Sequence, residues 1–208
     1  RTAITIFISR PMARYSNQIG GCANDRVRTT EEIVQRALSL GAAVARSFDA
    51  PRKEVIAFVE GAGLLQELTS SEHSYIYSSR RSAQQTVNMS WNSEALTVLL
   101  WSIGKLAHLP GPDTQCSTGV LSEVLPPYGS EPLDQFRGSA SRRSERVLFE
   151  MAKTIQLQHV VARQRKLNPK YRPDLGLINI EIVQERHRAI NWVVGYCAQN
   201  WDEVTADT

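Results

Sequence analysis

The chain has 208 residues, of which 42% are hydrophobic and 22% are charged, as in an average globular domain. Its 24 Lys and Arg residues stand against 21 Asp and Glu residues, and a net charge of only +3 does not favour nucleic-acid binding. The longest apolar run, residues 95–100, is far shorter than the roughly 18 to 20 residues that cross a bilayer, and no stretch resembles a signal peptide. We therefore expect one soluble domain over residues 1–208, without a membrane segment.

The first residues predict a short β-strand. Residues 2–8 alternate isoleucine with threonine and phenylalanine, a period of two that is typical of strands, and Pro11 ends the run. Residues 16–28 change to Asn, Gly, Cys and Asp, which indicates a loop. We expect residues 1–28 to form an N-terminal strand and loop.

Two capping boxes predict helix starts. Thr29-x-x-Glu32 precedes apolar residues at helical spacing, and Thr69-x-x-Glu72 opens a shorter helix that runs to about residue 80. Between these two helices, Asp49 is expected to cap a second helix that has Pro51 in its first turn. The apolar face of the first helix consists of Ile33, Ala37, Leu40, Val44 and Phe48.

The middle of the chain predicts a buried helix over residues 91–108, because its apolar side chains cover about two-thirds of a helical wheel. We expect its Trp91, Leu99 and Ile103 to be largely buried. Residues 111–141 are rich in Pro, Gly, Ser and Thr, and they predict a long surface loop with about one helical turn.

Two further helices are expected over residues 142–164 and 180–198. The predicted fold class is mainly α, with five to seven helices packed around the central helix. The short N-terminal strand adds a minor β contribution, so that in the strict sense the class is α+β.

The last predicted helix places a charged side chain inside its apolar face. At about 100° per residue, Arg186 falls in the middle of an arc of apolar residues and His187 lies at the edge of that arc. A buried arginine needs a partner, because an unpaired buried charge is costly and arginine does not lose its proton. We interpret Arg186 as a structural anchor for Asp202, Asp207 or Glu94, and we rank the two aspartates first.

The alternative interpretation is a functional pocket. Arg186 and His187, with a nearby carboxylate, would then hold an anionic ligand or carry out acid–base chemistry. A single histidine beside an apolar face is more often a packed residue, and no second His or Cys stands at ligand spacing, so no metal is expected. Asn191 is placed to hydrogen-bond His187. Glu181 or Glu185 would form a solvated pair with Arg188 on the exposed side of the helix.

Cysteine, glycine and serine patterns indicate neither a cofactor nor a nucleophile. Cys22, Cys116 and Cys197 are widely spaced and contain no C-x-x-C pair, so neither a disulfide framework nor a zinc site is expected. The odd number of cysteines favours a reducing, cytoplasmic location. No phosphate-binding glycine loop and no G-x-S-x-G elbow is present, and we expect no cofactor.

Basic residues gather around the helix predicted over residues 142–164. Arg142, Arg146, Arg163 and Arg165 would form a basic stripe if they shared its exposed side. Such stripes are most often solvated helix faces, and nucleic-acid recognition would need a larger charge excess or an identifiable reading element.

Several motifs together resemble a known family. They are W-x-x-E-A-L at residues 91–96, E-R-H-R-A-x-N-W at 185–192 and W-D-x-x-x-x-D-T at 201–208, with the helix start at 28–37. The combination resembles a family of uncharacterised bacterial proteins that is described as a domain of unknown function. The resemblance spans about residues 26–208 and implies a common fold, but it assigns no activity and no catalytic residue.

Two hypotheses of function follow. The first is a non-enzymatic interaction protein, immunity-like or adaptor-like, that contacts another protein through the 111–141 loop and the basic stripe. The second is an enzyme or small-anion binder with a pocket around Arg186 and His187. We favour the first because every catalytic template is missing. A sealed ion pair at Arg186 would favour the structural interpretation, whereas an open cleft would favour a site.

Overall fold

The structure is a computed structural model that describes residues 26–168, 170–171 and 173–207. These residues form eight α-helices and two short 3-10 helices, and they contain no β-strand. The strand expected over residues 2–8 lies outside the described residues. The helices are α2 (Thr30–Ser47), α3 (Arg52–Gly61), η1 (Leu65–Glu67), α4 (Ser70–Tyr77), α5 (Ala83–Ser102), α6 (Thr118–Val124), α7 (Leu133–Ser139), α8 (Glu145–Leu167), α9 (Ile180–Val193) and η2 (Tyr196–Ala198).

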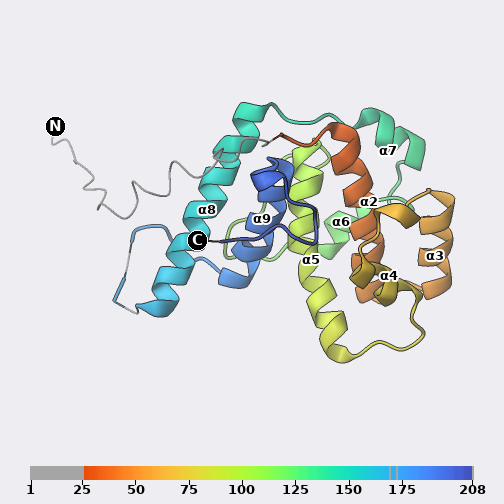
Figure 1. Ribbon diagram of the computed structural model, residues 1–208, viewed down its shortest axis with the longest axis horizontal. Coiled ribbons are helices and arrows are strands. Elements are labelled where there is room, and N and C mark those ends of the chain that lie inside the picture. The colour runs from red at the N-terminus through yellow and green to blue at the C-terminus, as the bar shows by residue number, and fades with distance from the viewer. Residues whose placement is uncertain (1–25, 169, 172, 208) are drawn as a thin grey trace.

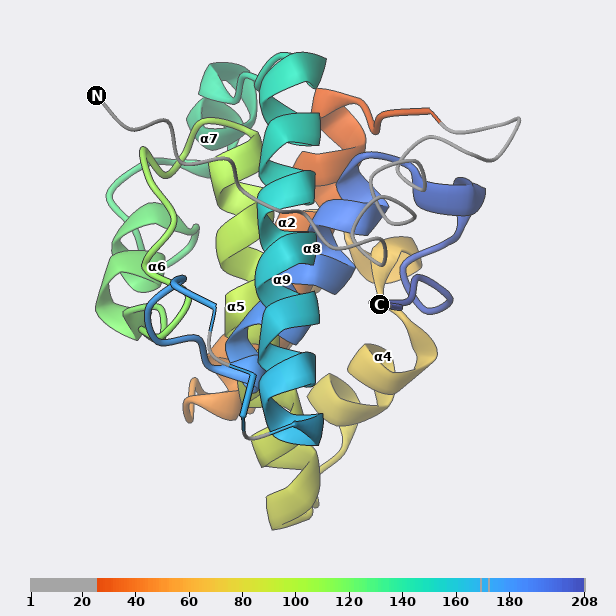
Figure 2. The same cartoon turned by 90° about the vertical axis from the view of Figure 1, so that its left-hand side faces the viewer.

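The long helices pack side by side in a row. Figure 1 shows α8 at one edge, followed by α9, α5 and α2, with α3 and α4 at the other edge, and each neighbouring pair in this row is in contact. Figure 2 shows α6 and α7 on one side of the row, away from α4. The fold is therefore mainly α, and its helix count exceeds the predicted five to seven because the 111–141 segment contributes two short helices.

Capping boxes mark where three of the helices begin. The capping boxes Thr29-x-x-Glu32 and Thr69-x-x-Glu72 are both formed, as predicted. A third box, with Ser82 as N-cap and Gln85 reaching back to it, starts α5 eight residues before the expected position 91. The first turns of α5 are polar and exposed, so the hydrophobic period did not reveal them.

The second helix does not begin at the predicted cap. Asp49 adopts a left-handed conformation with a φ of 65°, and Pro51 occupies the N-cap position of α3 without a side-chain hydrogen bond. Proline lacks a side-chain acceptor, so the start of α3 is set by its fixed φ. The side chain of Asp49 is left 90% exposed.

The centre of the core is the second half of α5. Leu99 and Ile103 are fully buried, as predicted, and Trp91, near the polar first half of the helix, is partly buried. The last helix ends at residue 193 rather than at 198. Gly195 takes a φ of 76° there, and a Cβ at this position would lie 2.1 Å from the backbone oxygen of Arg26, so only glycine fits.

The 111–141 segment differs from the predicted surface loop. Ser117 caps α6 by accepting a hydrogen bond from the backbone N–H of Val120, and Pro132 stands at the N-cap of α7. Leu121 and Leu125 are buried, and Phe136 has no exposed surface. The segment therefore contributes to the core, although neither of its helices is longer than seven residues.

The described residues bear on two expectations, the absence of a membrane segment and the absence of disulfides. No helix among them is long and apolar enough to span a membrane. Of the two described cysteines, Cys116 is free, but Cys197 takes part in a disulfide, so the argument against disulfides does not hold for Cys197.

We predict that Phe136→Ala lowers the free energy of unfolding by about 3 to 5 kcal/mol, because it leaves a cavity in the core. Val120→Ala, in the same segment but at a site that is 44% exposed, should cost less than about 1 kcal/mol. Urea unfolding of both variants measures the difference. Equal, small losses would show that the segment is a surface loop after all.

Candidate functional site

The Arg186 guanidinium is sealed inside the protein. Its side chain is 3% exposed, and its Nε and Nη2 lie 2.9 Å and 2.8 Å from the same Oε2 of Glu94, which is 1% exposed. Its Nη1 donates to the backbone oxygens of Pro110 and Gly111, and Nη2 also donates to that of Thr114. Each guanidinium nitrogen thus has a partner, and none is left for a ligand.

The carboxylate that pairs with Arg186 is that of Glu94, which we had expected less than those of Asp202 and Asp207. The other oxygen of Glu94 accepts the backbone N–H of Cys116 at 2.8 Å, so this ion pair joins α5, α9 and residues 110–116. Asp202 and Asp207 are both exposed, and Asp207 accepts a hydrogen bond from Thr205. The helical wheel predicted that Arg186 is buried, but it could not predict the contact with Glu94 of α5, which is distant in sequence.

His187 forms a buried pair with a histidine of the neighbouring helix. Its Nδ1 lies 3.1 Å from the Nδ1 of His159 on α8, and both rings are almost fully buried. Burial, reinforced by the charge of His159, lowers the pKa of His187 to about 3, against a smaller opposing effect of Asp207. Asn191 does not contact His187 as predicted, but donates to the backbone oxygen of Thr205.

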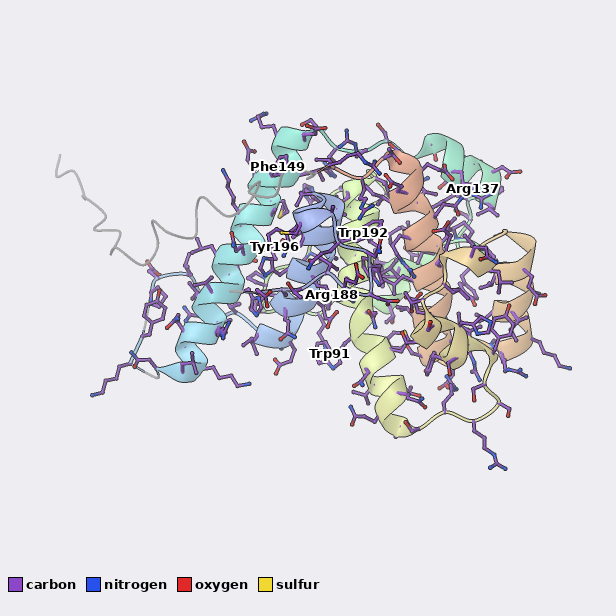
Figure 3. The ribbon with its side chains drawn as sticks, in the orientation of Figure 1. Trp91, Arg137, Phe149, Arg188, Trp192 and Tyr196 are labelled. Atoms are coloured by element: carbon purple, nitrogen blue, oxygen red, sulfur yellow. The ribbon has the colours of Figure 1, made fainter. Side chains whose placement is uncertain are left out.

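Arg188 is less exposed than the sequence indicated. It pairs with Glu185 as predicted, and it also donates to the side chain of Asn92 at 2.7 Å. Its guanidinium lies 4.6 Å from the ring centre of Trp201. Figure 3 shows Arg188 on α9 between Trp192 and Trp91, where α9 lies beside α5. Arg188 therefore packs into the helix interface, so its loss should cost more than that of a solvated arginine.

The basic residues of the α8 region do not form a compact stripe. Arg146 is paired with Glu150 on the same helix, and Arg142 approaches Glu145. Arg165 holds the backbone oxygens of Pro173 and Gly176. Arg146 and Arg163 are 17 positions apart in sequence, about 25 Å along an α-helix, so these charges are spread over its whole length.

Lys105, Glu131 and Ser139 are residue types that occur in catalytic sites, but here they bond to one another. Lys105 lies 2.5 Å from both Glu131 and Ser139, and its ammonium stands over the ring of Phe136. Lys105 is therefore engaged by an ion pair with Glu131 and a cation–π contact with Phe136. No group of three or more potential metal ligands is present in the part of the chain that the structure describes.

The clearest concave apolar surface lies between α2 and α6, and we call it the α2–α6 groove. It has a volume of about 290 Å³. Gly41 permits its narrow end, since a Cβ there would stand 3.3 Å from a methyl carbon of Leu125. Its main walls are Val44 and Ala45 of α2, the C-cap residue Phe48, Leu121 of α6, and Leu125 and Tyr128 of the following turn.

The rim of the groove exposes large apolar side chains to solvent. Phe48 is 49% exposed and Tyr128 is 42% exposed, although both line the groove. Val120, on α6, is 44% exposed. The sequence had placed Phe48 on the core face of its helix, but α2 ends at Ser47 and Phe48 stands at its C-cap. The groove itself was missed because its walls come from segments about 80 residues apart.

A larger recess near the C-terminal end is lined by many polar residues, and its two arginines are ion-paired. It has a volume of about 540 Å³ and lies between the start of α2 and the segment around Trp201. Arg28 is paired with Glu32, and Arg36 is paired with Glu72. We therefore regard the α2–α6 groove as the candidate functional site.

The Arg186 ion pair gives a first prediction on stability. Arg186→Ala should lower the free energy of unfolding by about 3 to 5 kcal/mol, because it leaves the buried Glu94 carboxylate without its partner. Arg146→Ala, which breaks a pair with 78% and 62% exposed side chains, should cost no more than about 1 kcal/mol. Thermal melts of both variants test this, and equal melting temperatures would refute the anchor role of Arg186.

The histidine pair gives a prediction on pH. An unfolded chain protonates His187 near pH 6.5, whereas the folded protein does so only near pH 3, so acid favours the unfolded chain. The stability contributed by the neutral ring is present above pH 6.5 and is lost as the pH falls toward 3. His187→Asn should therefore show a smaller drop in melting temperature between pH 7 and pH 5 than the parent protein. Parallel curves would contradict the assignment.

Comparison with known proteins gives one match. No curated protein and no solved structure matches the chain. A family model described as a domain of unknown function, DUF4272, matches residues 14–204, which is most of the chain and agrees with the resemblance in the motifs. The chain therefore belongs to the DUF4272 family, whose function is unknown.

Proposed function

We propose that this protein is a non-enzymatic, adaptor-like or immunity-like interaction protein that binds an apolar segment of a partner protein in the α2–α6 groove. The observation that carries the proposal is a concave apolar surface whose rim keeps Phe48 and Tyr128 nearly half exposed. Exposed large apolar side chains around a concavity are typical of interaction sites.

The size of the groove favours side chains over a cofactor. A volume of about 290 Å³ lies at the lower limit of small-molecule pockets, which span about 300 to 1,000 Å³. Two apolar anchors from a peptide would fill such a space, as in helix-in-groove recognition. One wall of the groove comes from the 111–141 segment, through which we expected contact with another protein.

The second hypothesis, a pocket around Arg186 and His187, is not favoured by the geometry. Both side chains are buried, and the guanidinium uses all its nitrogens on Glu94 and backbone oxygens. Lys105 is also ion-paired with Glu131. These arrangements support stability rather than acid–base chemistry.

The test is a selection of displayed random 12-residue peptides on the purified protein. We expect binders that carry at least two large apolar residues. Ala45→Leu should abolish their binding, because Ala45 is a half-buried wall residue and the larger side chain occupies the groove. Helix α2 should remain intact, since leucine is a good helix former.

Two variants serve as controls. Thr154→Leu places the same side chain on an exposed position of α8 and should leave binding unchanged. Leu177→Ser removes a 78% exposed apolar side chain far along the chain from the groove and should also have no effect. The proposal is wrong if no peptide is selected, if the selected peptides still bind Ala45→Leu, or if only Leu177→Ser releases them.

A further inference from the structure

Three arginines gather beside Asp49 and Ala50, two residues that line the α2–α6 groove. Arg81 donates through Nη1 to the backbone oxygen of Arg46 and, at 3.0 Å, to the hydroxyl of Tyr75. Arg46 donates to the backbone oxygen of Ala50, and Ala50 lines the groove. Arg52 holds the backbone oxygen of Tyr77 through Nε and Nη2. We call Arg46, Arg52 and Arg81 the arginine trio.

The trio carries more positive charge than its surroundings neutralise. Among the described residues, the carboxylate that pairs with it is Asp49, which lies 3.5 Å from Arg81 and is 90% exposed. Burial lowers the pKa of Arg46, and the charges of Arg81 and Arg52 lower it further. Such an excess is unfavourable unless an anion joins it.

The guanidinium of Arg46 is poorly satisfied by the protein. Its Nη1 makes a long bond of 3.3 Å to Ala50, and its buried Nε has no partner among the described residues. By contrast, Arg52 and Arg81 are fixed by backbone oxygens and Tyr75, so they cannot turn away from the cluster without losing those bonds. The trio thus combines two fixed charges with one guanidinium that has donors to offer.

We propose that the trio binds a carboxylate of the partner segment, so that the groove recognises an apolar anchor followed by an acidic residue. This inference rests on the proposed function and specifies the partner's chemistry. The planar fork of arginine matches a carboxylate with two parallel hydrogen bonds. Because Asp49 and Ala50 belong both to the groove and to the contacts of the trio, the acidic residue stands directly beside the apolar anchors.

The carboxylate of Asp49 competes with a partner carboxylate for the arginine trio. Its carboxylate is next to Arg81 and at the groove lining, so it repels an incoming carboxylate and partly neutralises the trio. Its left-handed φ of 65° is tolerated by asparagine as well as by aspartate. Asp49→Asn therefore removes the charge while it keeps the backbone, and it should strengthen binding of an acidic partner.

The experiment uses three synthetic peptides of the same apolar sequence, with leucine and phenylalanine anchors from the selected binders. The residues beside the anchors are Glu in the first peptide, Gln in the second and Lys in the third. Fluorescence anisotropy measures the dissociation constant of each peptide for the full chain. We expect the Glu peptide to bind about tenfold more tightly than the Gln peptide at low salt, and the Lys peptide to bind most weakly.

Variants of the protein test which residues recognise the carboxylate of the Glu peptide. Arg46→Gln should weaken the Glu peptide about tenfold and leave the Gln peptide unchanged, whereas Asp49→Asn should strengthen the Glu peptide several-fold. Arg146→Gln, which removes an equal charge from the exposed face of α8, is the matched control and should change neither peptide. A melting temperature equal to that of the parent protein shows that Arg46→Gln is folded.

The outcomes separate this inference from the proposed function. If all three peptides bind equally, or if Arg46→Gln weakens the Glu and Gln peptides alike, the trio does not recognise a carboxylate although the groove still binds apolar anchors. If the Lys peptide binds most tightly, the charge assignment is reversed and the inference is overturned. If no peptide binds, the groove is not a binding site and both proposals fail.

Discussion

The ion pair between Arg186 and Glu94 is the interaction on which the positions of several other elements depend. It crosses from α9 to α5, and the same two side chains bind the backbone of Pro110, Gly111, Thr114 and Cys116. The segment that follows is α6, which begins at residue 118 and forms one wall of the α2–α6 groove. A buried charge pair thus fixes the start of an irregular region that has little periodicity of its own.

Arginine serves mainly as a structural residue in this chain. Arg36 forms a second buried ion pair, with Glu72, and lies over the ring of Trp201. Arg137 and Arg143 donate to backbone oxygens at the ends of α3 and α5, where helices leave unsatisfied carbonyls. In these places the guanidinium groups bind carboxylates and backbone carbonyls within the fold.

The arginine trio is of interest because it departs from that pattern. Arg186 has all its nitrogens bonded inside the core, whereas Arg46 makes one long hydrogen bond to Ala50 and lies beside an apolar groove and two other positive charges. The same residue type therefore stabilises the fold at one place, and at another we propose that it binds a partner. The difference lies in the surroundings: Glu94 and four backbone groups converge on the first site, and one exposed aspartate approaches the second.

What the sequence determined by itself was local. The capping boxes at Thr29 and Thr69, the helical period of α9 and the burial of Arg186 depend on residues within a few turns of one another, so spacing alone reveals them. Only the tertiary structure decided that Arg186 meets Glu94 rather than Asp202 or Asp207, and that Phe136 belongs to the core. The same holds for the groove and the arginine trio. Their members come from helices and turns far apart in sequence, and their juxtaposition is set by how whole helices pack, which no local pattern of residues records.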